Sequence, residues 1–146
     1  MIKAHGGKKE FVKRLQAVFD NGLYDPANEP DIIYPYLFSR IKGEEWRTHR
    51  IVGELLDKYF TTAPDGIPGN EDCGTMSAWA IWSMMGMYPD TPGDPAFTLT
   101  VPRFDKITVK LDPEVWGKNY LEIKRRNAKA HSGRISHDEM LRRYGK

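Results

Sequence analysis

The sequence has a single cysteine, Cys73, among its 146 residues. One cysteine cannot form an internal disulfide, and its isolation excludes the structural zinc sites that need several thiolate ligands. No histidine stands at the spacing typical of a thiol nucleophile, and the four histidines form no pair at metal-ligand spacing. We therefore look for chemistry among the carboxylates and amides.

Long apolar runs are also missing. No stretch approaches the roughly 20 residues needed to cross a bilayer, and the first residues, MIKAHGGKKEFVKRL, lack the apolar segment of a signal peptide. We expect no membrane span, and the compartment stays open. With 40% apolar and 29% charged residues, the composition is that of one ordinary globular domain.

Charge is unevenly distributed along the chain. Residues 1–117 carry 13 Lys and Arg against 17 Asp and Glu, whereas residues 118–146 carry 9 against 3, for a net charge of +2 overall. The basic stretch EIKRRNAKAHSGR would suit nucleic acid, but it has no interleaved aromatic residues and matches no nucleic-acid motif. We favour a solvated surface and predict no nucleic-acid partner.

Four segments predict helices in the first part of the chain. Their apolar residues recur at helical spacing, and Gly and Pro separate them. Trp46 is assigned to the inward face of the third. The fourth is apolar nearly all round, which predicts neighbours on every side and more helical partners than this chain supplies. The segments are 7–22, 31–43 (with a kink or start at Pro35), 44–60 and 74–88.

The pattern changes after the breaker cluster TPGDP. The segments FTLTV, KITVKL and NYLEIKR alternate apolar and polar residues, which predicts antiparallel strands. At the end, Ser136 and Glu139 have the spacing of a capping box and predict a short helix. The predicted fold class is thus mainly α with a C-terminal β portion.

Acidic and amide side chains concentrate in two loops between the predicted helices. The loop NEP, Asn28–Pro30, opens the second helix, and GNEDCG, Gly69–Gly74, opens the fourth. If alternate loops emerge at the same end of a helical array, these two face one cleft. Such groups suit a calcium ion, which takes several oxygen ligands, or a general base that deprotonates water. The alternative is structural, with Asp72 as a helix N-cap and Glu29 as a first-turn acid.

Three segments in this order resemble the C-terminal part of the family 92 glycoside hydrolases, from about Gly6 to the ISHDEM stretch. The resemblance implies calcium-dependent, inverting exo-α-mannosidase activity, α-1,2-mannosidase-like, on terminal mannose of glycans. It also implies a segment of an (α/α)6 barrel over residues 1–92, followed by terminal strands over 93–146. The segments are NGLYDPANEPDIIYPYLF, TTAPDGIPGNEDCGTMSAWAIWSMMGMYP and FDKITVKL.

The resemblance also implies roles for individual residues. Asp72 aligns with the general base, and Glu71 and Asn70 accompany it as catalytic and substrate-binding residues. Asn28 and Glu29 align with a motif that helps to hold Ca²⁺, which draws on the 2- and 3-hydroxyls of the sugar. Thr75 departs from the family pattern, where Gln is common at this position.

The family's general acid, a glutamate, and its N-terminal β-sandwich have no counterpart in this sequence. The resemblance therefore implies that the chain alone is inactive and that its partner is the missing N-terminal part or a second copy. The parent enzyme is expected to be periplasmic or extracellular. The alternative is a non-catalytic carbohydrate-binding or assembly module that keeps the fold.

Overall fold

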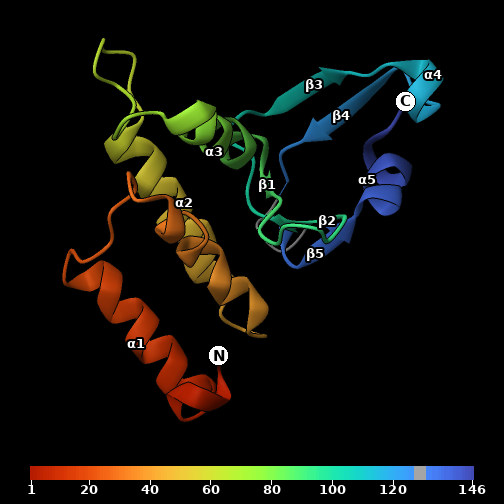
Figure 1. Cartoon of the computed structure of the whole chain (residues 1–146). Helices are drawn as coiled ribbons and strands as arrows, with labels where there is room; N and C mark the ends of the chain where they lie inside the picture. Colours follow the sequence, from red (N-terminus) through yellow and green to blue (C-terminus); the bar gives the residue numbers. More distant parts are fainter. Residues whose placement is uncertain (127–130) are drawn as a thin grey trace. The chain divides into compact units, whose positions relative to one another are not determined.

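The computed structural model describes residues 1–126 and 131–146 (Figure 1). Helices come first along the chain and antiparallel strands follow, which confirms the predicted fold class. The chain forms two compact units, Met1–Ser77 and Ala78–Lys146. The division into barrel helices and terminal strands at residue 92 stays a prediction. Residues 127–130 of the basic stretch lie outside the described residues.

In the first unit, α1 spans Lys8–Asp20 after the short 3-10 turn η1, Lys3–His5. Its apolar stripe is buried at Phe11, Val12 and Leu15, as helical spacing predicts. The helix ends before Gly22, whose φ of +65° is the left-handed conformation that often follows a helix.

The second predicted helix is wrong in type. Residues 29–40 form two 3-10 segments, η2 (Glu29–Asp31) and η3 (Tyr34–Arg40). Pro30 and Pro35 stand in the first turns and have no N–H to donate, so a continuous α-helical ladder cannot form across them. η3 packs against the next helix, and its residues Tyr36 and Phe38 are completely buried.

Helix α2 spans Glu45–Tyr59 and buries its apolar face at Ile51, Val52, Leu55 and Leu56. The prediction that Trp46 faces inward is wrong, because 51% of its surface is exposed. Its ring instead lies under the guanidinium groups of Arg47 and Arg50, at 4.5 and 5.6 Å from the ring centre.

Helix α3 spans Thr75–Met85 and follows the 3-10 turn η4, Asp72–Gly74. Met76, Trp79 and Ala80 are buried, but Ile81 is 58% exposed. Within the described part of the chain, this apolar helix is therefore only partly covered. An apolar helix is expected to have neighbours on every side, so the prediction that it needs further helical partners stands.

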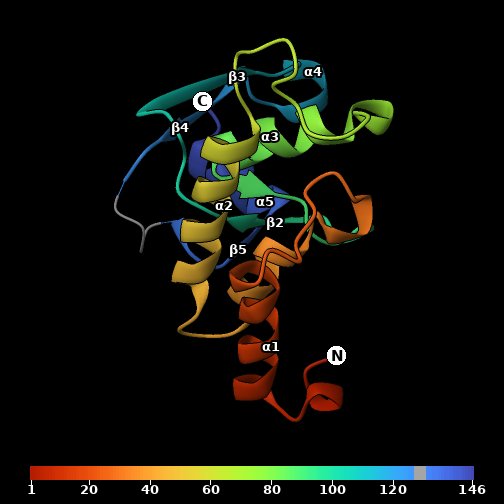
Figure 2. The same cartoon turned by 90° about the vertical axis from the view of Figure 1, so that its left-hand side faces the viewer.

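The second unit contains two antiparallel sheets. One has the strand order β1 (Met87–Tyr88), β2 (Ala96–Leu99) and β5 (Arg134–Ser136). The other is the hairpin of β3 (Lys106–Lys110) and β4 (Tyr120–Lys124), whose connection contains the one-turn helix α4, Pro113–Trp116 (Figure 2). The three predicted strands are confirmed. β5 lies outside the predicted strands, and β1 falls in a segment whose pattern predicts the end of a helix.

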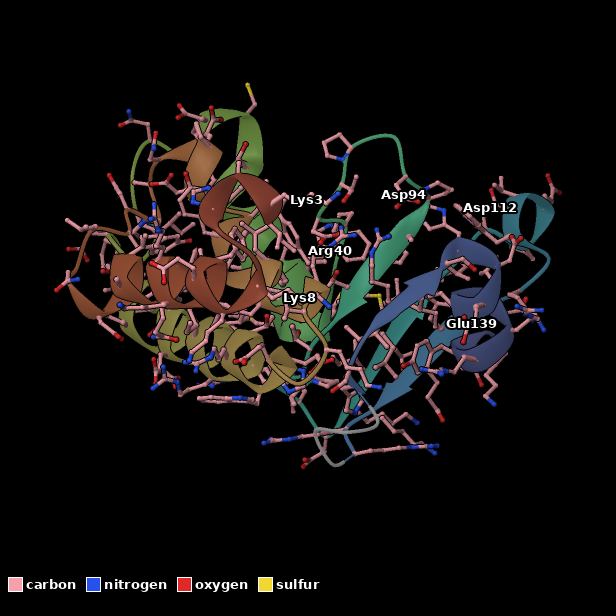
Figure 3. The ribbon with its side chains drawn as sticks, turned by 90° about the horizontal axis from the view of Figure 1, so that it is seen from below. Lys3, Lys8, Arg40, Asp94, Asp112 and Glu139 are labelled. Carbon is pink, nitrogen blue, oxygen red and sulfur yellow. The ribbon has the colours of Figure 1, made fainter. Side chains whose placement is uncertain are left out.

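The C-terminal helix α5, His137–Tyr144, begins as the capping box predicts, with the Ser136 hydroxyl accepting from the Glu139 N–H at 3.2 Å. Figure 3 shows Glu139 on this helix and Asp112 beside α4, which Asp112 caps through the Glu114 N–H. Met140 and Tyr144 join the apolar core that the strands form.

A cluster of ion pairs, in which Asp90 is buried, links the segment after β1 to β5. Arg134 lies 3.5 Å from Asp90 and 2.8 Å from Asp94, which stands just before β2 (Figure 3). The side chain of Asp90 is only 2% exposed. This negative charge lies near Tyr88, and burial together with Asp90 raises the pKa of Tyr88 to about 12.

We predict that the stability of the second unit falls as the pH rises from 10 towards 12. An unfolded tyrosine ionises near pH 10, whereas folded Tyr88 still holds its proton there, so deprotonation favours unfolding. The loss is about 1 kcal/mol by pH 11. Urea unfolding across this range measures it, and Tyr88→Phe is the control. Equal slopes for the wild type and Tyr88→Phe would contradict the prediction.

Candidate active site

The turn before α3 has an unusual backbone. Glu71 and Cys73 adopt left-handed φ angles of 68° and 56°, and they are the non-glycine residues with positive φ in the described chain. Such a conformation costs a residue with a side chain roughly 1–3 kcal/mol, and residues of this kind cluster at functional sites. Asp72 stands between them, so its position depends on both.

Hydrogen bonds from Glu71 hold this turn. Its carbonyl oxygen accepts from the N–H groups of Gly74 and Thr75, at 2.8 and 2.9 Å. Its carboxylate accepts the Ser77 N–H through both oxygens, at 3.2 Å each. The expectation that Asp72 caps α3 is therefore wrong, because Glu71 provides the cap. The six-residue separation of Glu71 from Ser77 matches no standard capping pattern, so this contact could not be predicted from local spacing.

The side chain of Asp72 is left available by this arrangement. Its backbone carbonyl accepts from the Thr75 hydroxyl at 2.6 Å, which fixes the residue. Its carboxylate is exposed and has no hydrogen bond or ion pair among the described residues. An ionised carboxylate held by its backbone and open to solvent can accept a proton from water.

The NEP loop presents its polar side chains in the same open manner. The Asp25 carboxylate accepts from the Ala27 N–H at 2.9 Å, and the Asn28 carbonyl accepts from Asp31 N–H at 2.8 Å. These bonds shape the backbone and leave the side chains of Asn28 and Glu29 exposed. Both residues offer oxygen atoms to a ligand.

The two loops meet at a glycine. Gly69 has a φ of +72°, and a Cβ placed on it would lie 2.7 Å from the Cβ and 3.3 Å from the Cα of Ala27. Only a residue without a side chain allows this approach. The contact brings Asn70 and Asn28, each one residue further along, into the same region of the first unit.

The described residues contain no group of three or more His, Cys, Asp or Glu side chains that could hold a metal ion. Asn28 and Glu29 have the oxygen donors that calcium prefers, but calcium takes six to eight ligands. The oxygen donors of these two residues fit calcium and make up part of such a set. The described chain also has no helix long and apolar enough to cross a membrane.

The sequence model of the Glycosyl hydrolase family 92 catalytic domain matches residues 1–139. The match covers nearly the whole chain. This protein belongs to glycoside hydrolase family 92. This membership confirms the resemblance to the family 92 glycoside hydrolases.

Similar proteins agree with this assignment. An uncharacterized secreted glycosidase of Arthroderma benhamiae is 27% identical over 110 residues, which are 75% of this chain and 14% of that protein. The family GH92 α-mannosidase BT3965 of Bacteroides thetaiotaomicron is 27% identical, with a TM-score of 0.79, and the match covers 91% of this chain and 20% of that one. The inverting mannosidase BT2199 of the same species is 28% identical, with a TM-score of 0.66, over 85% and 18%.

The chain therefore spans about a fifth or less of the length of these relatives. It aligns with one segment of a family 92 protein.

Proposed function

We propose that the chain supplies the general base and part of the calcium site of an inverting, calcium-dependent α-mannosidase that acts on terminal mannose, α-1,2-mannosidase-like in its linkage. The observation that carries the proposal is the exposed carboxylate of Asp72, which has no partner among the described residues. It lies in a strained turn, and Gly69 just before this turn contacts Ala27 at the start of the NEP loop. The family and its mannosidase members support the choice of substrate.

Asp72 acts as the base. Its carboxylate takes a proton from water as the water oxygen attacks the anomeric carbon, and the glycosidic bond breaks on the opposite side of the ring. A carboxylic acid elsewhere gives its proton to the departing oxygen. In inverting enzymes the two carboxyl groups stand about 6.5–9.5 Å apart, which leaves room for the water. Asn70, two residues before Asp72, binds the sugar.

In this proposal the acid comes from a part of the enzyme outside the family 92 segment that residues 1–139 match. We therefore expect the chain alone to hydrolyse no mannoside, since loss of one member of an acid–base pair costs about 10²–10⁴-fold. The partner of this chain is that remaining part, and no nucleic acid takes part. A chimera tests the function: residues 1–139 of this chain replace the matching segment of BT3965, and mannose release is measured. A chimera that folds but releases no mannose would contradict it.

Asn28 and Glu29 would hold the calcium ion together with ligands from the remaining part of the enzyme. Bound there, the ion would coordinate hydroxyls of the mannose ring and favour its distortion. The chain's own residues orient the site, since the Asp25 carboxylate and the Asn28 carbonyl fix the loop.

We predict that Glu29→Gln and Asn28→Ala each weaken calcium binding to the metal-stripped chimera by about 10-fold or more, because each removes one of few ligands. Asp72→Asn spares binding, since the base is not a ligand. Titration calorimetry measures the affinity, and Asp31→Asn, in the same turn, is the control. Equal affinities for Glu29→Gln and Asp31→Asn would exclude Glu29 from the metal site.

A further inference from the structure

Glu71 differs from Asp72 in what its carboxylate does. Both oxygens of Glu71 face the Ser77 N–H at 3.2 Å, and the side chain is half-buried. Asp72, one residue later, is exposed and has no side-chain partner among the described residues. The two adjacent acids thus have different surroundings: the carboxylate of Glu71 accepts a backbone N–H, and that of Asp72 is open to solvent.

The contact of Glu71 spans the whole turn that contains Asp72. The backbone carbonyl of Glu71 accepts from the N–H groups of Gly74 and Thr75, and its carboxylate accepts from the Ser77 N–H. Three N–H groups thus donate to one residue and close the loop around Asp72 and Cys73. These bonds offset the cost of the left-handed conformations at Glu71 and Cys73. A strained turn of this kind persists only while such bonds hold it.

We propose that Glu71 is a positioning residue, whose bond to the Ser77 N–H aims Asp72 at the attacking water, and that its carboxylate takes no part in proton transfer. This inference rests on the proposed role of Asp72 as the base. It assigns to Glu71 a task that a neutral hydrogen-bond acceptor can perform. Glutamine keeps a carbonyl oxygen at the same reach, and alanine has none.

The first test uses the full chain and needs no activity. In NMR measurements Glu71→Ala speeds hydrogen exchange at the Ser77 amide by about 10-fold or more, because the lost bond is one to a charged acceptor. It also lowers the backbone order parameter at Asp72. The amides of Trp79 and Ala80 in α3 keep their protection, which separates loss of the turn from loss of the helix. Glu71→Gln stays close to the wild type at all these positions.

The second test separates positioning from chemistry in the chimera with BT3965. Glu71→Ala lowers kcat by about 10²-fold, the typical cost of misplacing a reacting group by about 1 Å, and changes KM less than kcat. Glu71→Gln recovers most of kcat and keeps the wild-type pH profile. Equal loss in Glu71→Gln and Glu71→Ala would overturn the inference, because it would show that the charge itself is needed.

The two tests also separate this inference from the proposed function. If the backbone order parameter at Asp72 is unchanged in Glu71→Ala, the positioning role of Glu71 is overturned, whether or not the chimera is active. A chimera that folds and is inactive, or that is unaffected by Asp72→Asn, overturns the proposed function and leaves the NMR result on Glu71 standing.

Discussion

Asp72→Asn lowers mannose release by the chimera with BT3965 by about 10²–10⁴-fold, the range expected when a general base is lost. Asparagine has nearly the same shape as aspartate but cannot accept the proton of water. The substitution leaves the turn intact, because the Asp72 side chain makes no hydrogen bond to the described residues and its backbone is held through Thr75. The loss therefore falls on kcat.

Initial rates on an aryl α-mannoside measure this effect, with circular dichroism to confirm folding. Asp65→Asn is a matched control, since Asp65 is an exposed acid of the same long loop. We expect that variant to keep wild-type activity. A kcat for Asp72→Asn within a fewfold of the wild type would show that another group deprotonates the water.

We predict that Gly69→Ala pushes the two loops of the candidate site apart. The new methyl group would overlap the Ala27 side chain at 2.7 Å, and the left-handed φ of +72° adds strain. We expect a loss of about 2–5 kcal/mol from the stability of the first unit, made up of roughly 1–2 kcal/mol for the left-handed conformation and about 1–3 kcal/mol for the overlap.

Gly22→Ala is the matched control, because Gly22 has a similar φ of +65° and open space around its missing Cβ. Urea unfolding gives both losses of stability, and their difference reports the contact between Gly69 and Ala27. We also expect Gly69→Ala to weaken calcium binding by the chimera more than Gly22→Ala does. Equal effects of the two variants on stability and on calcium binding would contradict the contact.

The sequence predicts correctly the elements that depend on residues close together along the chain. The stripe of Phe11, Val12 and Leu15 defines α1 by its spacing, and Ser136 with Glu139 defines the start of α5. Prediction from such local patterns failed where other interactions prevail. Pro30 and Pro35 divide a helix-like pattern into 3-10 turns, and Met87–Tyr88 leaves the helix to pair with β2.

The roles of the candidate site residues stay predictions, whereas the backbone conformation of the turn was missed. The spacing of NEP and GNEDCG indicated the two loops, and Gly69 brings them together. The left-handed conformations of Glu71 and Cys73 have no sequence signal, because residues with side chains adopt them only when surrounding bonds require it. For that reason the cap was assigned to Asp72, whereas Glu71 provides it.

The central proposal is that Asp72 is the base of an inverting hydrolase. The most direct test is whether added azide restores the activity of the Asp72→Asn variant of the chimera. Azide needs no deprotonation, so it can attack the anomeric carbon from the side on which the water would stand. The account predicts that azide restores turnover of an aryl α-mannoside by the variant chimera and that the product is the β-mannosyl azide. No restored turnover, or an α-mannosyl azide, would contradict it.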